Sequence, residues 1–203
     1  MGPELLPLFP LEVVLLPQSA LPLHIFEERY KLLIGEAIEQ RSEFGVVLAK
    51  ENALANVGCT AVVERVTRRY EDGRLDILTR GERRFEILLL DEKKPYLRAG
   101  VHFFGDDGRP ATPEAVRRLG AAFEKALHLL SAATPQRPAP GERLTSFQVA
   151  GALPIDLDVK QRILALRSEA ERTDVLCEFL EGYLPRLERA RRLEAAARGN
   201  GHG

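Results

Sequence analysis

The sequence is poor in cysteine, with only Cys59 and Cys177 among its 203 residues. Neither belongs to a close pair with the spacing of a zinc site or a redox-active dithiol. Small secreted folds that depend on disulfides carry many more cysteines, and here a single bridge is the most that the chain can form. The composition therefore favours a reducing compartment.

Nucleotide and metal motifs are also missing. No stretch matches G-x-x-x-x-G-K-[ST], and no G-x-G-x-x-G follows a predicted strand. The histidines at positions 24, 102, 128 and 202 are isolated from one another, so no helix face carries two imidazoles at ligand spacing. A nucleophilic site built from Ser19, His24 and Glu27 lacks any activating motif. We therefore expect no cofactor, no metal and no enzymatic activity.

An excess of either charge is absent as well, because 29 basic and 30 acidic residues give a formal net charge of -1. No global field attracts nucleic acid or an anionic membrane. The N-terminus has no basic region ahead of its apolar residues, and prolines interrupt every stretch long enough for a signal or a membrane span. We expect a cytoplasmic protein without a membrane partner, and any other partner must bind a local surface.

The first ordered stretch, LPLFPLEVVLLPQSALPLHIFEERYKLLI at residues 6–34, is rich in proline and almost free of charge before Glu27. Proline removes a backbone donor, so this stretch cannot be one long helix or a central strand. The apolar run Leu11–Leu16 predicts one short buried strand, with prolines only at its ends. Apolar residues then recur at helical spacing from Tyr30 to Ile38. The pattern predicts a strand, a turn and a helix.

Five runs between residues 43 and 104 have β-strand character: EFGVVLAK, GCTAVVERVTRRY, RLDILTRG, RRFEILLLDE and PYLRAGVHFF. Asp72 and Gly73 separate two of them and predict a hairpin. Gly81 lies inside an otherwise continuous run and predicts a bulge or a sharp bend. Short, bent strands are typical of a coiled sheet or barrel. We assign residues 1–105 to this β-rich lobe, with the N-terminal helix inserted in it.

The pattern becomes helical after residue 105. Thr112 followed by Pro113 is a helix-start pair, and Ser168 begins a second such signal ahead of the last helix. Short helical patterns lie at 147–153 and 158–166, and the segment 134–141 predicts an exposed loop. Gly182 and Pro185 predict that the last helix bends or ends near its middle. We assign residues 106–203 to an α-helical lobe with a disordered C-terminal tail, RGNGHG, which makes the fold class α+β.

One hairpin region suggests an alternative function, because β-barrels with arginine-rich hairpins can bind RNA. Seven arginines lie there: Arg65, Arg68, Arg69, Arg74, Arg80, Arg83 and Arg84. Acidic residues in the same region largely cancel the field that a phosphate backbone would need. Cross-strand ion pairs on a solvated face are the interpretation that we favour, and RNA binding through the Arg65–Arg84 hairpin stays the alternative.

The stretch LPLFPLEVVLLPQSALPLHIFEERY at 6–30 resembles the signature that opens the substrate-binding N-terminal domain of the Lon protease family. Further matches follow in order: FGVVL at 44–48, DGR at 72–74, RGERRFEI at 80–87, PYLRA at 95–99 and ALPIDLDVKQRILAL at 152–166. The sequence departs from the family pattern at Gln18 and Ser19, where glycine is common, and at Glu28, where proline is common. The resemblance covers nearly the whole chain and is to the short bacterial stand-alone form, without ATPase or protease domains.

The resemblance implies a six-stranded, PUA-like coiled β-barrel lobe followed by an α-helical lobe. It also implies a non-enzymatic module that binds unfolded or apolar peptide segments or a specific protein partner, as an adaptor or substrate-capture protein in protein quality control. Loops stiffened by proline present apolar side chains at little further entropic cost. The candidate binding residues are Phe9, Pro10, Leu21, Pro22 and Phe26.

Overall fold

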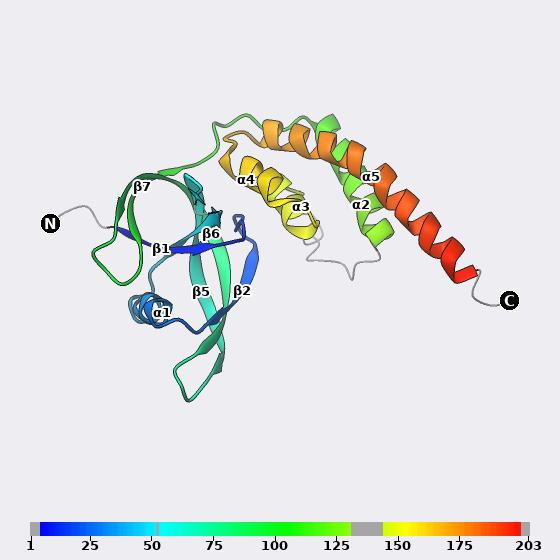
Figure 1. Ribbon diagram of the computed structural model, residues 1–203. Helices are drawn as coiled ribbons and strands as arrows, with labels where there is room; N and C mark the ends of the chain where they lie inside the picture. Colours follow the sequence, from blue (N-terminus) through cyan, green and yellow to red (C-terminus); the bar gives the residue numbers. More distant parts are fainter. Residues whose placement is uncertain (1–4, 52, 131–143, 200–203) are drawn as a thin grey trace. The chain divides into compact units, whose positions relative to one another are not determined.

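A computed structural model describes residues 5–51, 53–130 and 144–199 of the chain (Figure 1). Its contacts divide the chain into two units, and each is described here by itself. The first comprises Met1–Gly105 with Ile155–Ala165, and the second comprises Asp106–Pro154 with Leu166–Gly203. We expected residues 106–203 to form one helical lobe, but the segment Ile155–Ala165 groups with the barrel.

Strands of the first unit close into a ring. The bounds are β1 Leu6–Leu11, β2 Ala20–Ile25, β3 Phe44–Lys50, β4 Ala53–Leu54, β5 Val57–Arg69, β6 Leu75–Asp91 and β7 Arg98–Phe104. The neighbour order is β1-β7-β6-β5-β3, and a parallel pairing of β1 with β3 joins the two ends. β2 pairs with β6 outside this ring, and β4 pairs with β3. The predicted coiled barrel is therefore confirmed, although the described residues place five strands in the ring and seven in the whole sheet, where six were expected.

The prediction of a strand over Leu11–Leu16 is wrong, because β1 lies earlier in the chain. β1 divides its pairing between two partners: its first residues pair with β7, and those from Leu8 onward pair with β3. Residues 12–19 form a loop that buries Leu15 and Leu16. An apolar run that fills the core from a loop has the same hydrophobicity as a buried strand, so composition alone cannot separate them.

The loop before β2 is held against Gly81, inside β6. The Gln18 N–H donates to the Gly81 carbonyl at 2.8 Å, and the Gly81 N–H donates to the Ser19 carbonyl at 2.9 Å. A Cβ atom at position 81 would lie 2.2 Å from the Leu16 carbonyl oxygen, which leaves room only for glycine. The register of β5 and β6 shifts beside this residue. The predicted bulge at Gly81 is confirmed.

Two helices belong to the first unit. α1, Glu28–Gln40, buries Tyr30, Leu33, Ile34 and Ala37, which confirms the predicted amphipathic helix. α4, Leu157–Ala165, packs on β5, where the Gln161 amide donates to the Val57 carbonyl at 2.9 Å.

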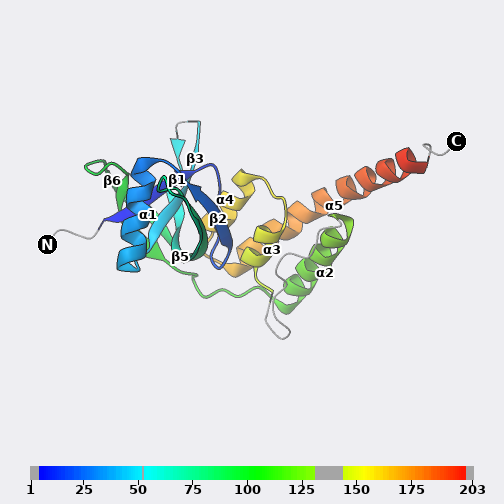
Figure 2. The same cartoon turned by 90° about the horizontal axis from the view of Figure 1, so that it is seen from below.

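The second unit is helical, with α2 Pro113–Leu130, α3 Ser146–Ala152 and α5 Glu169–Gly199. α2 and α5 lie side by side in both views (Figures 1 and 2), and a Lys125–Glu188 ion pair at 2.7 Å joins them. The Thr112 hydroxyl accepts from the Ala115 N–H at 3.2 Å, which confirms the predicted cap of α2.

The last helix is longer than predicted, because α5 continues through Gly182 and Pro185. Pro185 is exposed, so water can hydrate the Glu181 carbonyl that loses its N–H donor. The predicted disordered tail is helical as far as Gly199, and its residues 200–203 lie outside the described residues. The predicted loop at 134–141 also lies outside them.

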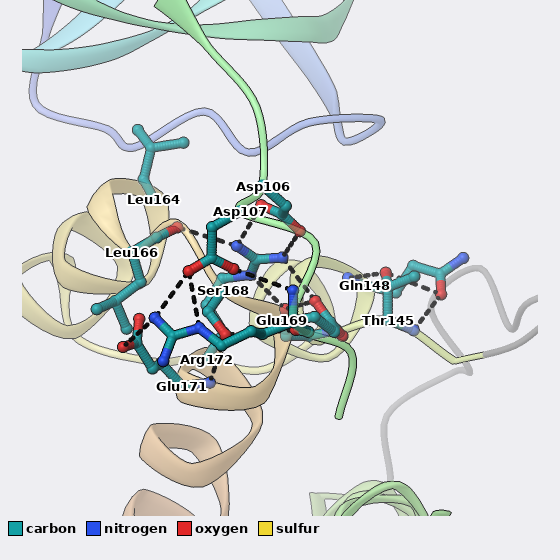
Figure 3. Close-up of polar contacts among 12 residues, drawn as sticks. Asp106, Asp107, Thr145, Gln148, Leu164, Leu166, Ser168, Glu169, Glu171 and Arg172 are labelled. Carbon is teal, nitrogen blue, oxygen red and sulfur yellow. Dashed lines mark hydrogen bonds and ion pairs between the residues drawn. The ribbon is translucent and has the colours of Figure 1, made fainter. Parts of the chain in front are cut away.

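A buried arginine ties the second unit together (Figure 3). The Arg172 side chain is 1% exposed and donates to both carboxylate oxygens of Asp106, at 2.8 and 2.6 Å. It also donates to Glu169 at 2.7 Å, to the Ser146 hydroxyl at 2.9 Å and to the Leu166 carbonyl at 2.9 Å. We call these five residues the Arg172 network. It joins the entry segment of the unit to the starts of α3 and α5.

Candidate binding surface

The outer edge of β2 is the feature of the first unit most open to a partner. One edge of β2 pairs with β6, and the other pairs with no strand in the described part of the chain. Side chains alternate along it, with Ala20, Pro22 and His24 exposed. Pro22 carries no N–H, which interrupts the donor row and limits pairing of this edge with copies of itself. The carbonyl groups of such an edge remain available to an extended peptide.

A group of stacked rings continues from this edge. His24 Nδ1 lies 2.5 Å from Asp76 Oδ1, and the Tyr70 hydroxyl donates to Asp76 Oδ2 at 2.8 Å. The Phe26 ring stacks on His24 with centroids 5.9 Å apart, and the Tyr70 ring meets His24 edge-on at 5.8 Å. Phe26 is 59% exposed. We call the surface formed by Pro22, His24, Phe26 and Tyr70 the β2 platform.

Electrostatics hold the rings of the β2 platform in place. Hydrogen bonds from His24 and Tyr70 lower the pKa of Asp76, so this carboxylate stays charged at neutral pH. The hydrogen bond to Asp76 in turn raises the pKa of Tyr70 and keeps its hydroxyl protonated as the donor. The guanidinium groups of Arg68 and Arg74 lie 4.6 and 4.8 Å from the centroid of the same ring. Such contacts fix the orientation of the half-buried Tyr70 ring.

Two of the five predicted binding residues, Pro22 and Phe26, lie on this surface, and a third, Leu21, alternates to the opposite face of β2. Leu21 is half-buried and Pro22 exposed on β2, and Phe26 follows directly after the strand. The other two belong to β1. Phe9 is 5% exposed and packs on Tyr30, with ring centroids 4.1 Å apart, so it supports the barrel core.

Sequence reasoning missed other members of the β2 platform and a second apolar area. His24 and Tyr70 are 46 positions apart (70 − 24), and only the pairing of β2 with β6 brings Asp76 between them. Leu88, Leu89 and Leu90 are all exposed, at a register shift in β6. A strand alternates its faces, so three consecutive leucines could not all be covered by one core. The run of three leucines in a predicted strand could therefore have indicated an exposed apolar area from the sequence alone.

Four of the seven arginines of the β5–β6 hairpin region have polar partners, namely Arg74, Arg80, Arg83 and Arg84. Arg80 donates to Glu64 on the neighbouring strand at 2.8 Å and lies 2.7 Å from Glu82. Arg84 is buried and donates to the Leu164 carbonyl of α4 at 3.1 Å. Arg80 therefore forms the cross-strand ion pair that we favoured from the sequence.

Chemistry elsewhere in the described residues is limited. They contain no group of three or more histidine, cysteine or acidic side chains able to hold a metal ion. Both cysteines are buried and unpaired, and burial raises the pKa of the Cys59 thiol to about 12. None of the helices in the described ranges combines the length and hydrophobicity that a membrane crossing needs.

The fold therefore defines a two-unit protein, in which a closed β-barrel with an exposed aromatic edge is followed in the sequence by a helical unit. Residues 5–182 match the substrate-binding domain of ATP-dependent protease La (LON), and the chain belongs to this family. This match confirms the resemblance drawn from the proline-rich opening.

Relatives agree with this assignment. A Lon protease of Parabacteroides distasonis is 33% identical over 111 residues, covering 51% of this chain and 14% of that protein. A Lon protease of Anaeromyxobacter dehalogenans is 23% identical over 97% of this chain. The chain spans only 25% of the length of that relative.

Two solved structures share the fold. A Lon N-terminal domain protein from Xanthomonas campestris has a TM-score of 0.67 at 24% identity, over 85% of this chain and 96% of that one. The N-terminal domain of Lon protease from the Mycobacterium avium complex has a TM-score of 0.63 at 20% identity, over 88% and 98%.

Proposed function

We propose that the chain is a non-enzymatic module that captures extended, apolar segments of other proteins on the β2 platform, as a substrate-capture or adaptor protein in protein quality control. The observation that carries this proposal is the exposed ring of Phe26, stacked on His24 beside the edge of β2 that pairs with none of the described strands. Membership in a family of substrate-binding domains supports it.

The geometry of the β2 platform suits a peptide in extended conformation. A strand laid along the outer edge of β2 gains main-chain hydrogen bonds, while its alternate side chains reach Pro22 and Phe26. Asp76 orients His24 and Tyr70 before any ligand arrives, so binding orders few side chains. Preorganisation of this kind lowers the entropic cost of association.

A matched pair of variants tests the platform. Phe26→Ser removes the exposed ring, and Leu193→Ser removes an equally exposed apolar side chain from α5. We expect Phe26→Ser to weaken binding of a fluorescent, unfolded apolar peptide roughly tenfold, because an aromatic anchor at an interface contributes more than about 1 kcal/mol. Leu193→Ser should bind like the wild type, as measured by fluorescence anisotropy.

Equal binding by all three proteins would remove the β2 platform from the proposal. RNA binding through the Arg65–Arg84 hairpin is the competing function, and its signature is an affinity that falls steeply with salt. Apolar capture depends only weakly on salt, so anisotropy at two ionic strengths separates the two.

A further inference from the structure

We propose that the first unit holds a second peptide site, a cleft that binds the free α-carboxylate of a client's C-terminal residue together with that residue's apolar side chain. This inference deepens the proposed function and rests on it. The cleft has a volume of about 530 Å³ and is lined by the start of β1, the end of α1, and parts of β6 and β7 with the segment before β7. That size lies within the usual range for pockets that enclose small ligands, roughly 300–1,000 Å³.

One wall of the cleft is fixed by a closed polar network. Lys94 Nζ donates to the two carboxylate oxygens of Glu36, at 3.0 and 2.8 Å, and contacts the Tyr96 hydroxyl at 2.8 Å. The Tyr96 hydroxyl also donates to Glu36. An ammonium group has three donors, so Lys94 has none left. This wall is rigid and close to neutral, and the ligand must be held by other groups.

The remaining cations leave the cleft positive. Arg41, Arg83, Lys94 and Arg98 line it, and the carboxylates of Glu36, Glu43 and Asp91 offset three of these four charges, which leaves one net positive charge. Arg98 donates from Nε and Nη2 to Asp91, at 3.0 and 2.6 Å. A guanidinium carries five N–H groups, so this pairing leaves Arg98 donors for a ligand.

Arg41 adds a cation without a carboxylate partner in the described part of the chain. It is exposed and follows the last turn of α1 in the left-handed conformation, with φ of 51°. Because no internal ion pair must break when an anion approaches, this guanidinium is the most available of the four. A ligand carboxylate gains a charge-assisted hydrogen bond there without loss elsewhere.

Apolar surface lies beside these cations. The guanidinium of Arg83 lies 3.9 Å from the centroid of the Phe103 ring, and its Nε donates to Glu43 at 3.1 Å. The stack on Phe103 and the bond to Glu43 together fix the plane of this guanidinium. Phe103 is 38% exposed, and Leu6 and half-buried Val101 line the same cleft.

A C-terminal residue meets both demands at once, because its carboxylate and its side chain leave the same Cα atom. An internal acidic residue would place its carboxylate at the end of its own side chain, and a neighbouring residue would have to supply the apolar group. The chain would also have to leave the cleft in two directions. A C-terminal residue needs only one path for the chain out of the cleft.

The test compares two fluorescein-labelled decapeptides of the same sequence, whose last two residues are leucine and phenylalanine. One peptide has a free C-terminal carboxylate and the other has a C-terminal amide. We expect the free acid to bind the full chain roughly tenfold more tightly at low salt, which corresponds to one charge-assisted contact. Arg41→Gln should remove most of that difference. Arg117→Gln, an exposed arginine of α2 outside the cleft, makes the same change of charge and should keep it.

The outcomes separate the two proposals. Equal binding of acid and amide by the wild type, with both weakened by Phe26→Ser, would overturn the carboxylate site and leave peptide capture standing. A preference for the acid that Arg41→Gln does not reduce would also overturn the site, since its most available cation would play no part. Absence of binding by either peptide would remove the proposed function and this inference with it.

Discussion

The Arg172 network and the β2 platform use similar chemistry in opposite surroundings. In the network, charged groups from distant segments meet around an arginine that is almost completely buried. In the platform, Asp76 accepts hydrogen bonds from His24 and Tyr70 on an open surface. Burial makes an interaction expensive to break, and exposure leaves its rings free to contact a partner. The network should therefore govern stability, and the platform should govern binding.

The largest effect is expected from Arg172→Met. This change leaves Asp106 and Glu169 without their shared cation, and breaking a buried ion pair costs about 3–5 kcal/mol. Arg118→Met is the matched control, because its pair with Glu181 is exposed and such pairs contribute about 1 kcal/mol or less. Urea unfolding of the full chain, followed by circular dichroism, measures both. Similar losses in the two variants would break the comparison.

The next effect is expected at Gly81, which anchors the loop before β2. Gly81→Ala forces a Cβ atom against the Leu16 carbonyl, and we expect a loss of about 2 kcal/mol or more, typical of an overpacked site. Gly120→Ala has open space around the new atom and lies within α2, where alanine is favoured by about 0.5–1 kcal/mol. The two substitutions should therefore shift the thermal midpoint in opposite directions. A stable Gly81→Ala protein would show that the loop can move away.

Tyr70→Phe tests the platform by titration. The pKa of Asp76 is below its ordinary 3.8, and losing the Tyr70 hydrogen bond should raise it. A carboxyl group with a lowered pKa stabilises the fold above its unfolded-state pKa of about 3.9, and this contribution is lost as the pH falls through the lower folded value. The titration midpoint of Asp76 can be measured by carboxyl carbon NMR. The pH should run from about 2 to about 6, which is about two units on either side of the ordinary pKa of about 3.9. An unchanged midpoint would mean that Tyr70 does not hold the carboxylate.

The smallest effect is expected for RNA. The wild-type chain should not bind a single-stranded RNA oligonucleotide even at low salt, and Arg69→Gln should change nothing. Arg80 is already neutralised by Glu64, and Arg84 is buried. Electrophoretic mobility shifts at low ionic strength measure this, where electrostatic attraction is strongest. A shift that Arg69→Gln weakens would restore the RNA alternative.

Local signals predicted much of the fold. The glycine at 81, the Asp72–Gly73 turn and the helical spacing after Tyr30 each act within a few residues, so the sequence around them was enough. The hairpin turn is held by the Gly73 N–H, which donates to the Tyr70 carbonyl at 3.1 Å. The helix starts at Thr112 and Ser168 could be predicted for the same reason, because a capping side chain acts within three residues.

Long-range pairing was not predictable in this way. Arg172 and Asp106 are 66 positions apart, and no local sequence pattern around either residue predicts that they form a pair. The ring group of the platform depends equally on the register that places His24 opposite Asp76. Phe26 was named from its apolar neighbourhood, and only its 59% exposure distinguishes it from buried Phe9.

Closure of the barrel has a consequence for synthesis. β1 pairs with β7, with Leu6 opposite Ala99, so the strand of this sheet that is synthesised first waits for the described strand that is synthesised last. At translation rates of 5–20 residues per second, that wait lasts roughly 5–20 s. During it, the apolar side chains of Leu6 and Leu8 lack the cover of Phe85 and Ala99, which belong to the same core cluster. Pro7 and Pro10 interrupt the donors of this nascent segment, so the prolines that mark the opening of the sequence also reduce pairing between neighbouring chains on a polysome.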